Sequence, residues 1–485
     1  MDASAIRPPD RLGTERARWY LLALAAVQRL AYGLEAGALP FSEARLFDSA
    51  VYAHQASAIL AGRFDDPSLV AFGPLYGWFL AAVGDAWLPA QLALGVGTAF
   101  LIERTAARHS PAAGLIALAL WIGYALPLFY ETKMMSETLG LFFLVVAVYL
   151  LLDPGVRPLR LLGGGAALGL AVLTRANLLF ALPFFLLVAL RPSERAATFR
   201  PRGRSAAAVG LGIALVLGAN GAWNAAWSGR FVPVILVSRT ASVASSHGGW
   251  TGSLETLSTA GAPSAWDVVR QAEQTLASDD QSDGALRIDV LGWVRSAPAK
   301  LARTFSDVET TFQYGFYGER TEIRSLAWQP ISFGTLLVLA ALGAALIGRR
   351  RGLGAVLEHT PLLLCVVLVT TLFHPSSRYR LPMIVPLVAL GSAGIVELFR
   401  VERASLRRGF VAAAIFVCGA LAIRHWTHAL AHPAMWQLQV AEGEYARGDL
   451  AASAARVARA MELSEEGDET RRRIDVLRAH RALPQ

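Results

Sequence analysis

The stretch LPMIVPLVALGSAGIVEL, residues 381–398, decides the fold class of this chain. It is nearly free of charge and long enough to cross a bilayer as an α-helix, which takes about 20 apolar residues. Four arginines follow it, Arg400, Arg403, Arg407 and Arg408. Short arginine-rich loops of this kind are typical of the cytoplasmic side of a membrane. Apolar runs of similar length recur along the chain, which predicts an all-α polytopic membrane protein.

The composition agrees with a protein that lies largely within a membrane. Hydrophobic residues make up 54% of the 485 residues and charged residues only 17%, whereas soluble proteins carry more charge. The formal net charge is +8, but the arginines cluster between apolar runs and no RNA- or DNA-binding pattern accompanies them, so no nucleic-acid partner is expected. The two cysteines, Cys365 and Cys418, lie in apolar runs and are interpreted as core residues.

The apolar runs predict a bundle of about eleven transmembrane helices. The arginine-rich N-terminus is placed in the cytoplasm, and every arginine-rich short loop then falls on that side. Residues 71–102 are also compatible with one long bent helix. The predicted spans are residues 19–38, 86–102, 111–129, a run ending near 152, a helical hairpin over 161–190, 206–226, 327–347, 355–373, 381–398 and 409–428.

This topology divides the chain into a transmembrane domain, residues 1–430, and a soluble C-terminal domain, residues 431–485, on the extracytoplasmic side. Two long loops face the same side. The first covers residues 39–85. The second covers residues 227–325 and is rich in Ser, Gly and Asp, and the apolar residues of its second half have helical spacing.

The C-terminal domain contains QLQVAEGEYARGDLAASAARVARAMELSEE, which predicts two helices joined by a Gly-Asp turn. The pattern is similar to a single tetratricopeptide-type hairpin. One such repeat rarely buries its own apolar face, so we expect it to pack on the rest of the chain or on a protein partner. The residues that carry the likeness are Gly443, Tyr445, Gly448, Ala455 and Ala460.

The segment FDSAVYAHQASAILAGRF, residues 47–64, places Asp48 where the chain has just left the membrane. A carboxylate beside lipid is costly and is therefore a functional candidate, although Asp48 also fits a helix cap. Two short helices along the membrane are predicted nearby, Ser49–Leu60 and Pro74–Val83. His54 is either an assistant to Asp48 or a helix-face histidine bonded to a carbonyl.

Two further motifs place ionisable side chains at the extracytoplasmic ends of spans. ETKMMSE contains Lys133 and Glu137. A lysine suits a lipid phosphate as a point charge, whereas Ser136 and Glu137 equally fit the start of a helix. LTRANLL places Arg175 at the tip of the 161–190 hairpin, where snorkelling to the interface is the alternative role.

The fourth motif, FHPSSRYRLPM, carries Arg378 and Arg380 on either side of Tyr379, with His374 nearby. Two guanidiniums at the membrane face suit a phosphate ester held at headgroup depth. Binding of lipid headgroups without any substrate role is the alternative.

Taken together, these motifs resemble those of the GT-C integral-membrane glycosyltransferases, in the branch that holds protein O-mannosyltransferases and lipid A aminoarabinose transferases. The resemblance covers roughly residues 20–425. It departs from the family at Ser49, where some relatives carry a second acid, and at Ala176, where proline is common. It rests on Asp48, Tyr52, Ala56 and Gly62, then PLYGWFLA, SETLGLFFL, LTRANLL and RYRLP, in that order.

The resemblance implies inverting transfer of a sugar from a polyprenyl-phosphate donor to an extracytoplasmic acceptor (a lipid, a glycan or a protein) at a bacterial inner membrane. It implies that Asp48 acts as the catalytic base or lies beside the acceptor, and that Glu137 faces the site. Membrane lipid surrounds such an enzyme. The candidates for binding the donor phosphate are Arg378, Arg380 and Lys133, and the other site candidates are Tyr52, His54, Arg175, His374 and Tyr379.

No cofactor and no required metal ion are expected. Asp65 and Asp66 are adjacent acids that could hold a divalent cation, but such pairs in loops are usually only solvated. Two other functions remain open. A transporter or flippase of lipid-linked sugars would need charges deep in the spans and inverted repeats. A non-catalytic assembly protein would use its C-terminal hairpin to recruit partners and would not need Asp48.

Overall fold

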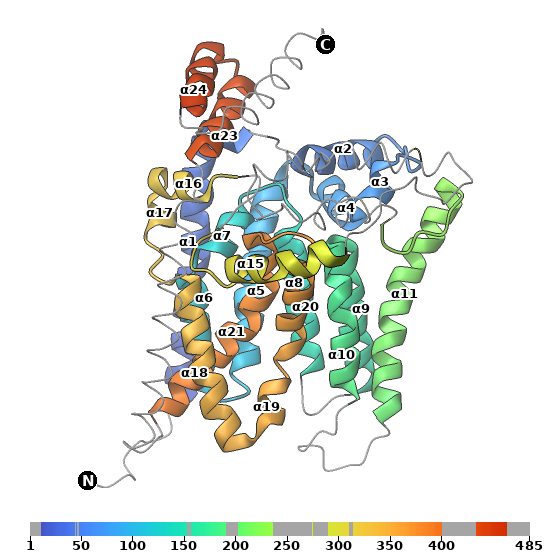
Figure 1. Ribbon diagram of the computed structural model, residues 1–485, viewed down its shortest axis with the longest axis vertical. Helices are drawn as coiled ribbons and strands as arrows, with labels where there is room; N and C mark the ends of the chain where they lie inside the picture. The colour runs from blue at the N-terminus through green and yellow to red at the C-terminus, as the bar shows by residue number, and fades with distance from the viewer. Residues whose placement is uncertain are drawn as a thin grey trace.

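The computed structural model describes residues 11–43, 45, 48–152, 157–190, 202–235, 274, 290–309, 314–399 and 433–462. Within these ranges the chain is all-helical and contains no β-strand. The helices of the first half form most of the bundle in Figure 1. They are α1 (Arg11–Ala38), η1 (Pro40–Glu43), α2 (Asp48–Leu60), α3 (Ser68–Ala71), α4 (Pro74–Val83), η2 (Gly84–Ala86), α5 (Trp87–Ala106), α6 (Pro111–Gly123), α7 (Ala125–Glu131), α8 (Glu137–Leu151), α9 (Pro158–Thr174), η3 (Ala176–Ala181), α10 (Leu182–Ala189) and α11 (Arg202–Ser228).

The second half adds helices to the same bundle and a helical hairpin outside it (Figure 1). These are α15 (Val290–Thr304), α16 (Phe316–Glu322), α17 (Arg324–Ala327), α18 (Phe333–Arg351), α19 (Leu353–Leu357), α20 (Thr360–Leu372), α21 (Ser377–Leu398), α23 (Pro433–Ala446) and α24 (Leu450–Glu462). The short helices α2 and α4 match the two that were predicted in the first loop. The predicted span 409–428, and Cys418 within it, lie outside the described residues.

Four helical stretches in the described part are long and apolar enough to cross a membrane, which indicates a membrane protein. They are residues 74–106, 203–228, 333–351 and 377–398. The first joins α4, η2 and α5 end to end, with Gly84 (φ 53°) between α4 and α5. Five shorter apolar helices accompany them: residues 111–123, 137–151, 158–174, 176–189 and 360–372.

Ion pairs identify which helix ends lie together. Near the start of α1, Arg18 Nε lies 3.0 Å from Oε1 of Glu103 in α5. At the end of α18, Arg350 pairs with Glu397 at the end of α21 at 2.5 Å, and His109 contacts the same carboxylate at 3.1 Å. We call this the lower end of the bundle, as oriented in Figure 1. The opposite end, which carries α2, α4, α16 and α23, is the upper end.

The predicted span over residues 111–129 is wrong in one respect, because the helix is interrupted at Tyr124, whose backbone is extended (φ −101°, ψ 121°). Pro127 explains the break. A proline has no N–H for the carbonyl of Gly123, four residues earlier, and its ring clashes with that carbonyl. The Gly123 carbonyl accepts a hydrogen bond from the Ile331 N–H instead, at 3.0 Å.

The predicted extracytoplasmic turn HPSSRYR is also wrong in part, because α21 already begins at Ser377. Arg378 and Arg380 therefore lie in the first turn of this helix. Residues two apart in an α-helix point in directions about 200° apart. The two guanidiniums consequently face different neighbours, although the sequence places them side by side.

The C-terminal hairpin packs on the upper end of the bundle. Its first helix, α23, contacts α16 and η1. The Trp436 side chain is 7% exposed and Gln439 is fully buried. The Arg447 Nη2 donates to the Leu39 carbonyl at 2.9 Å. The hairpin thus packs on the rest of the chain through α23, which is one of the two alternatives expected for it.

Candidate functional site

Four charged side chains from different parts of the chain meet at the upper end. Arg378 Nη1 donates to Asp48 Oδ2 at 2.6 Å, and the same nitrogen lies 4.0 Å from Oε1 of Glu137. Glu137 is ion-paired with Arg175. We call Asp48, Glu137, Arg175 and Arg378 the charged cluster. All four were candidates from the sequence, and 330 residues separate Asp48 from Arg378.

Helix ends position each member of the charged cluster. Asp48 and Glu137 are the first residues of α2 and α8, where the positive end of the helix dipole favours a carboxylate. Arg175 follows the last residue of α9, where a cation is favoured. Arg378 lies in the first turn of α21, where the dipole disfavours it, so the two carboxylates compensate its charge.

Burial divides the charged cluster into two pairs. The side chains of Asp48 and Arg378 are 15% and 13% exposed. Those of Arg175 and Glu137 are 8% and 1% exposed. The first pair is therefore more exposed than the second.

Aromatic residues line the cluster. The Tyr379 ring centroid lies 5.2 Å from the Arg378 guanidinium carbon and 5.8 Å from that of Arg175, distances that suit cation–π contact. The Tyr52 hydroxyl donates to Ser136 Oγ at 3.0 Å. Burial, followed by the charge of Asp48, raises the pKa of the Tyr52 hydroxyl, so it stays protonated as a donor.

His374 lies against the same group. Its ring centroid is 4.9 Å from that of Tyr379. Burial, together with the positive charge of Arg378, lowers the pKa of His374 to about 3. The imidazole is therefore neutral at ordinary pH, and its contribution to the site is that of a polar, uncharged side chain.

His54 lies away from Asp48 and contacts Asp66, with 2.9 Å between Nε2 and Oδ2. Burial would raise the pKa of Asp66, but hydrogen bonds from Ser68 and the neighbouring His54 hold it below its ordinary value of 3.8. Asp66 is thus engaged in local structure. No group of three or more His, Cys, Asp or Glu side chains suited to a metal ion occurs among the described residues.

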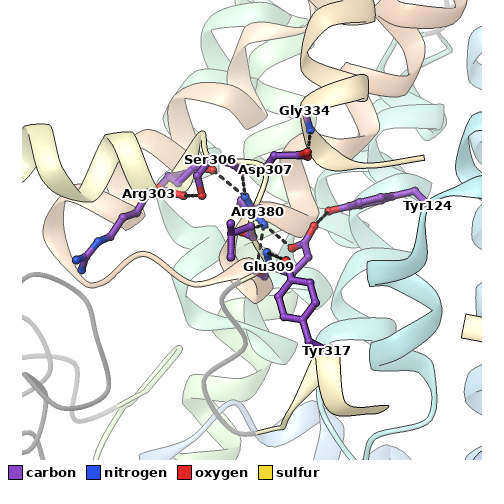
Figure 2. A network of polar contacts seen from close by, with 11 residues as sticks. Tyr124, Arg303, Ser306, Asp307, Glu309, Tyr317, Gly334 and Arg380 are labelled. Carbon is purple, nitrogen blue, oxygen red and sulfur yellow. Dashed lines mark hydrogen bonds and ion pairs between the residues drawn. The ribbon is translucent and has the colours of Figure 1, made fainter. Parts of the chain in front are cut away.

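Figure 2 shows that Arg380 belongs to a second polar network. Its guanidinium is ion-paired with Glu309, and Arg380 is 1% exposed. It also donates to Ser377 Oγ at 3.0 Å. The Tyr124 hydroxyl donates to Glu309 at 2.6 Å. The guanidinium further donates to the carbonyls of Thr304, Ser306 and Val308 at 3.2, 2.7 and 2.8 Å.

The structure therefore separates the two arginines that were expected to meet one phosphate. Arg378 lies in the charged cluster and is paired with Asp48, whereas the donors of Arg380 hold the turn after α15. Moving Arg380 onto a ligand would leave Glu309 buried without its partner, which costs several kcal/mol. We therefore assign Arg380 a structural role and keep Arg378 as the candidate for binding an anion.

Lys133, the third phosphate candidate, is also engaged within the protein. Its Nζ donates to Oε1 of Glu319 at 2.5 Å and lies 4.7 Å from the Phe129 ring centroid. Burial raises the pKa of the Glu319 carboxyl and lowers the pKa of the Lys133 ammonium, while the charge of each partner opposes the shift of the other. The pair therefore fastens α16 to the turn before α8.

Several buried partners were not found from the sequence. Arg29 forms a two-point ion pair with Glu131, with N–O distances of 2.9 and 2.8 Å. A lone arginine within an apolar run is costly and implies a partner, so Arg29 was a usable signal. Glu309 and Glu319 gave no such signal, because acids are common in a long polar loop.

In comparisons with known proteins, no family model matches this chain and no curated protein matches it. The interpretation of the site rests on its geometry and on the residue patterns described above.

Proposed function

We propose that the protein transfers a sugar from a polyprenyl-phosphate donor to an acceptor hydroxyl at the upper end of the bundle, on the extracytoplasmic side of the membrane. The observation that carries the proposal is the Asp48–Arg378 pair at 2.6 Å. It combines a carboxylate suited to general-base catalysis with a guanidinium suited to a phosphate ester. The resemblance of the surrounding motifs to GT-C glycosyltransferases supports the same function.

In the proposed reaction, the acceptor oxygen attacks the anomeric carbon while the bond from that carbon to the phosphate oxygen breaks. The hydroxyl proton passes to the Asp48 carboxylate, and the electron pair of the broken bond leaves with polyprenyl phosphate. Arg378 stabilises the charge that grows on this leaving group, which is the main electrostatic task of the step. The attack and the departure occur on opposite faces of the sugar, so the configuration inverts.

Glu137 and Arg175 balance the charge of Arg378 during this step. The Glu137 carboxylate, 4.0 Å from Arg378 Nη1, keeps a negative charge beside Arg378 when the guanidinium shifts from Asp48 to the donor phosphate. Arg175 neutralises the charge of Glu137. With two acids and two arginines, the charged cluster has no formal net charge. A shift of Arg378 toward the phosphate would release Asp48 as a base at the moment when the donor is bound.

The test is transfer of labelled sugar from polyprenyl phosphate by the purified protein in lipid nanodiscs. We expect Arg378→Ala to lower kcat/KM for the donor roughly 30-fold or more. This factor corresponds to a loss of about 2 kcal/mol of transition-state stabilisation, the scale for losing a charge-assisted contact at a partly dry site. Arg378→Lys should restore only part of this, because an ammonium cannot form the two-point contact of a guanidinium.

Arg459→Ala is the matched control, because this arginine is 59% exposed on α24 and should leave the rate unchanged. Full activity of Arg378→Ala would remove Arg378 from the mechanism. If the wild-type protein transferred no sugar but moved lipid-linked sugars across vesicle membranes, the transporter function would replace this one.

A further inference from the structure

The short helix α16, with the two residues before it, is linked to the elements that carry Asp48, Glu137 and Arg378. These are α2, the turn before α8, and α21. The first link is to α2. The Tyr314 hydroxyl donates to Ser49 Oγ at 3.0 Å, and Ser49 directly follows Asp48. Tyr314 is 3% exposed and Ser49 is fully buried, so this hydrogen bond is shielded from water.

The second link is to the turn before α8. Glu319 accepts from Lys133 Nζ at 2.5 Å and from the Tyr32 hydroxyl at 3.1 Å. Lys133 lies four residues before Glu137. Its own carbonyl accepts from Gln91 Nε2 at 2.8 Å, so the turn is held from both sides.

The third link is to α21. The Tyr317 hydroxyl accepts from the backbone N–H of Glu309 at 2.9 Å, and Glu309 is the ion-pair partner of Arg380. Arg380 lies two residues after Arg378. In Figure 2, Tyr317 lies below Glu309 and Tyr124 lies to its upper right.

The C-terminal hairpin holds α16 in place by close packing. Gln439 Oε1 accepts from the Gly315 N–H at 2.6 Å. The Trp436 side chain covers Gly315 and Gly318 so closely that a Cβ added at Gly318 would lie 2.1 Å from Trp436 Cγ. Glycine at position 318 is therefore required by space, and the indole rests directly on the backbone of α16.

We propose that Trp436 and Gln439 are positioning residues, which set the place of α16 and, through its three links, the relative positions of Asp48, Glu137 and Arg378. The C-terminal hairpin is then part of the site machinery rather than only a platform for partners. Small displacements matter because misplacing a reacting group by about 1 Å can cost about 10²-fold in rate. The catalytic consequence, but not the structural coupling, rests on the proposed function.

Hydrogen–deuterium exchange of the full-length protein in nanodiscs tests the coupling without any substrate. We expect Trp436→Ala to speed exchange at residues 314–319, and also at 49–52 and 133–137, by about tenfold or more, because local opening free energies set exchange rates. Gln439→Leu should act in the same direction, and it replaces Trp436→Ala if that variant fails to fold. Faster exchange confined to α23 and α16 would overturn the proposal.

Arg447→Ala is the matched control, because Arg447 fastens the hairpin to η1 and not to α16. Its exchange at 49–52 and 133–137 should equal that of the wild type. A control variant that loosened both segments equally would show that any weakening of the hairpin has this effect, and would also overturn the roles of Trp436 and Gln439.

A double-mutant cycle adds a second test. Gly318→Ala alone should displace the indole and speed exchange at the three linked segments. In a Trp436→Gly background the added methyl has room, because the three atoms nearest to it all belong to the Trp436 side chain, so the double variant should exchange no faster than Trp436→Gly. Additive effects would contradict a direct contact.

Sugar transfer, where it is measurable, gives a kinetic test of the same proposal. The single variants should lower kcat about tenfold and leave the donor KM within about twofold of the wild-type value. Absence of transfer in the wild type would refute only the proposed function.

Discussion

At the residue scale, the site is a row of alternating charges that compensate one another. Asp48, Arg378, Glu137 and Arg175 follow in that order through successive contacts. A buried charge is tolerated only when it is paired and hydrogen-bonded. The inner pair is compensated in charge by the Glu137–Arg175 ion pair, while both Glu137 carboxylate oxygens are buried without a hydrogen bond.

His374 gives this arrangement a predicted dependence on pH. Its pKa is lowered from the ordinary 6.5 to about 3, so between these values the unfolded chain binds a proton that the folded protein does not. Stability should therefore fall as pH drops below about 6.5, by up to about 1.4 kcal/mol per pH unit from this group. We expect His374→Gln to flatten that part of the profile, measured as the thermal unfolding midpoint between pH 7.5 and 5. Parallel profiles for the two proteins would contradict this.

The members of the charged cluster could be predicted because each lies at the end of an apolar run, where an ionisable residue is conspicuous. Their pairing could not, since it depends on which faces of α2, α8, α9 and α21 meet. The separation of Arg378 from Arg380 was missed for a simpler reason. The predicted helix begins four residues after the start of α21, so Arg378 and Arg380 were placed in a loop. A loop does not impose the opposite side-chain directions that the first turn of a helix imposes.

At the element scale, the short helix α4 of the first loop packs against α9. Gly73, at the start of α4, lies against the end of α9, next to Arg175. A Cβ at Gly73 would be 2.5 Å from the Leu173 carbonyl oxygen and 2.7 Å from that of Thr174. Its backbone (φ −58°, ψ 115°) is open to other residues, so space rather than conformation requires glycine.

We therefore expect Gly73→Ala to destabilise the protein by about 1–3 kcal/mol, the usual cost of overpacking against atoms that cannot move aside. Gly37→Ala is the matched control, because nothing lies within 4 Å of a Cβ added there and α1 gains helix propensity. Thermal unfolding of both variants in the same detergent decides the matter. Equal midpoints for Gly73→Ala and the wild type would show that α4 does not pack on α9 in this way.

Most helices could be predicted from apolar runs, and α2, α4 and the hairpin of α23 and α24 from helical spacing. The interruption at Tyr124 was missed although Pro127 indicates it, because the continuous apolar run was given more weight than the single proline. The start of α1 at Arg11, eight residues before the predicted span, was missed because the added turns are polar. Arg18 within them is held by Glu103, a partner that the sequence does not reveal.

At the scale of the whole molecule, the charged cluster, α16 and the C-terminal hairpin share the upper end, while Arg350, Glu397 and the start of α1 share the lower end (Figure 1). An arginine-rich end of a membrane protein is typically cytoplasmic. We therefore expect the charged cluster and the hairpin to lie on the extracytoplasmic side.

Labelling of introduced cysteines in a Cys418→Ser background tests this orientation. Leu450 on α24 is 61% exposed and Leu353 on α19 is 68% exposed, and they lie at opposite ends. A membrane-impermeant maleimide should modify Leu450→Cys in intact cells and Leu353→Cys only after permeabilisation, with the buried native Cys365 silent in both. The reverse pattern would invert the topology and move the site to the cytoplasm.

The most direct measurement of the central claim is the rate of sugar transfer by Asp48→Asn. Asparagine keeps the size of the side chain and can still cap α2, but it cannot take a proton from the acceptor. We predict that transfer from polyprenyl phosphate falls by about 10²-fold or more, the usual worth of a positioned general base, while protein abundance and donor binding stay close to those of the wild type. Turnover near the wild-type rate at normal abundance would contradict the account and leave Asp48 as a helix cap paired with Arg378.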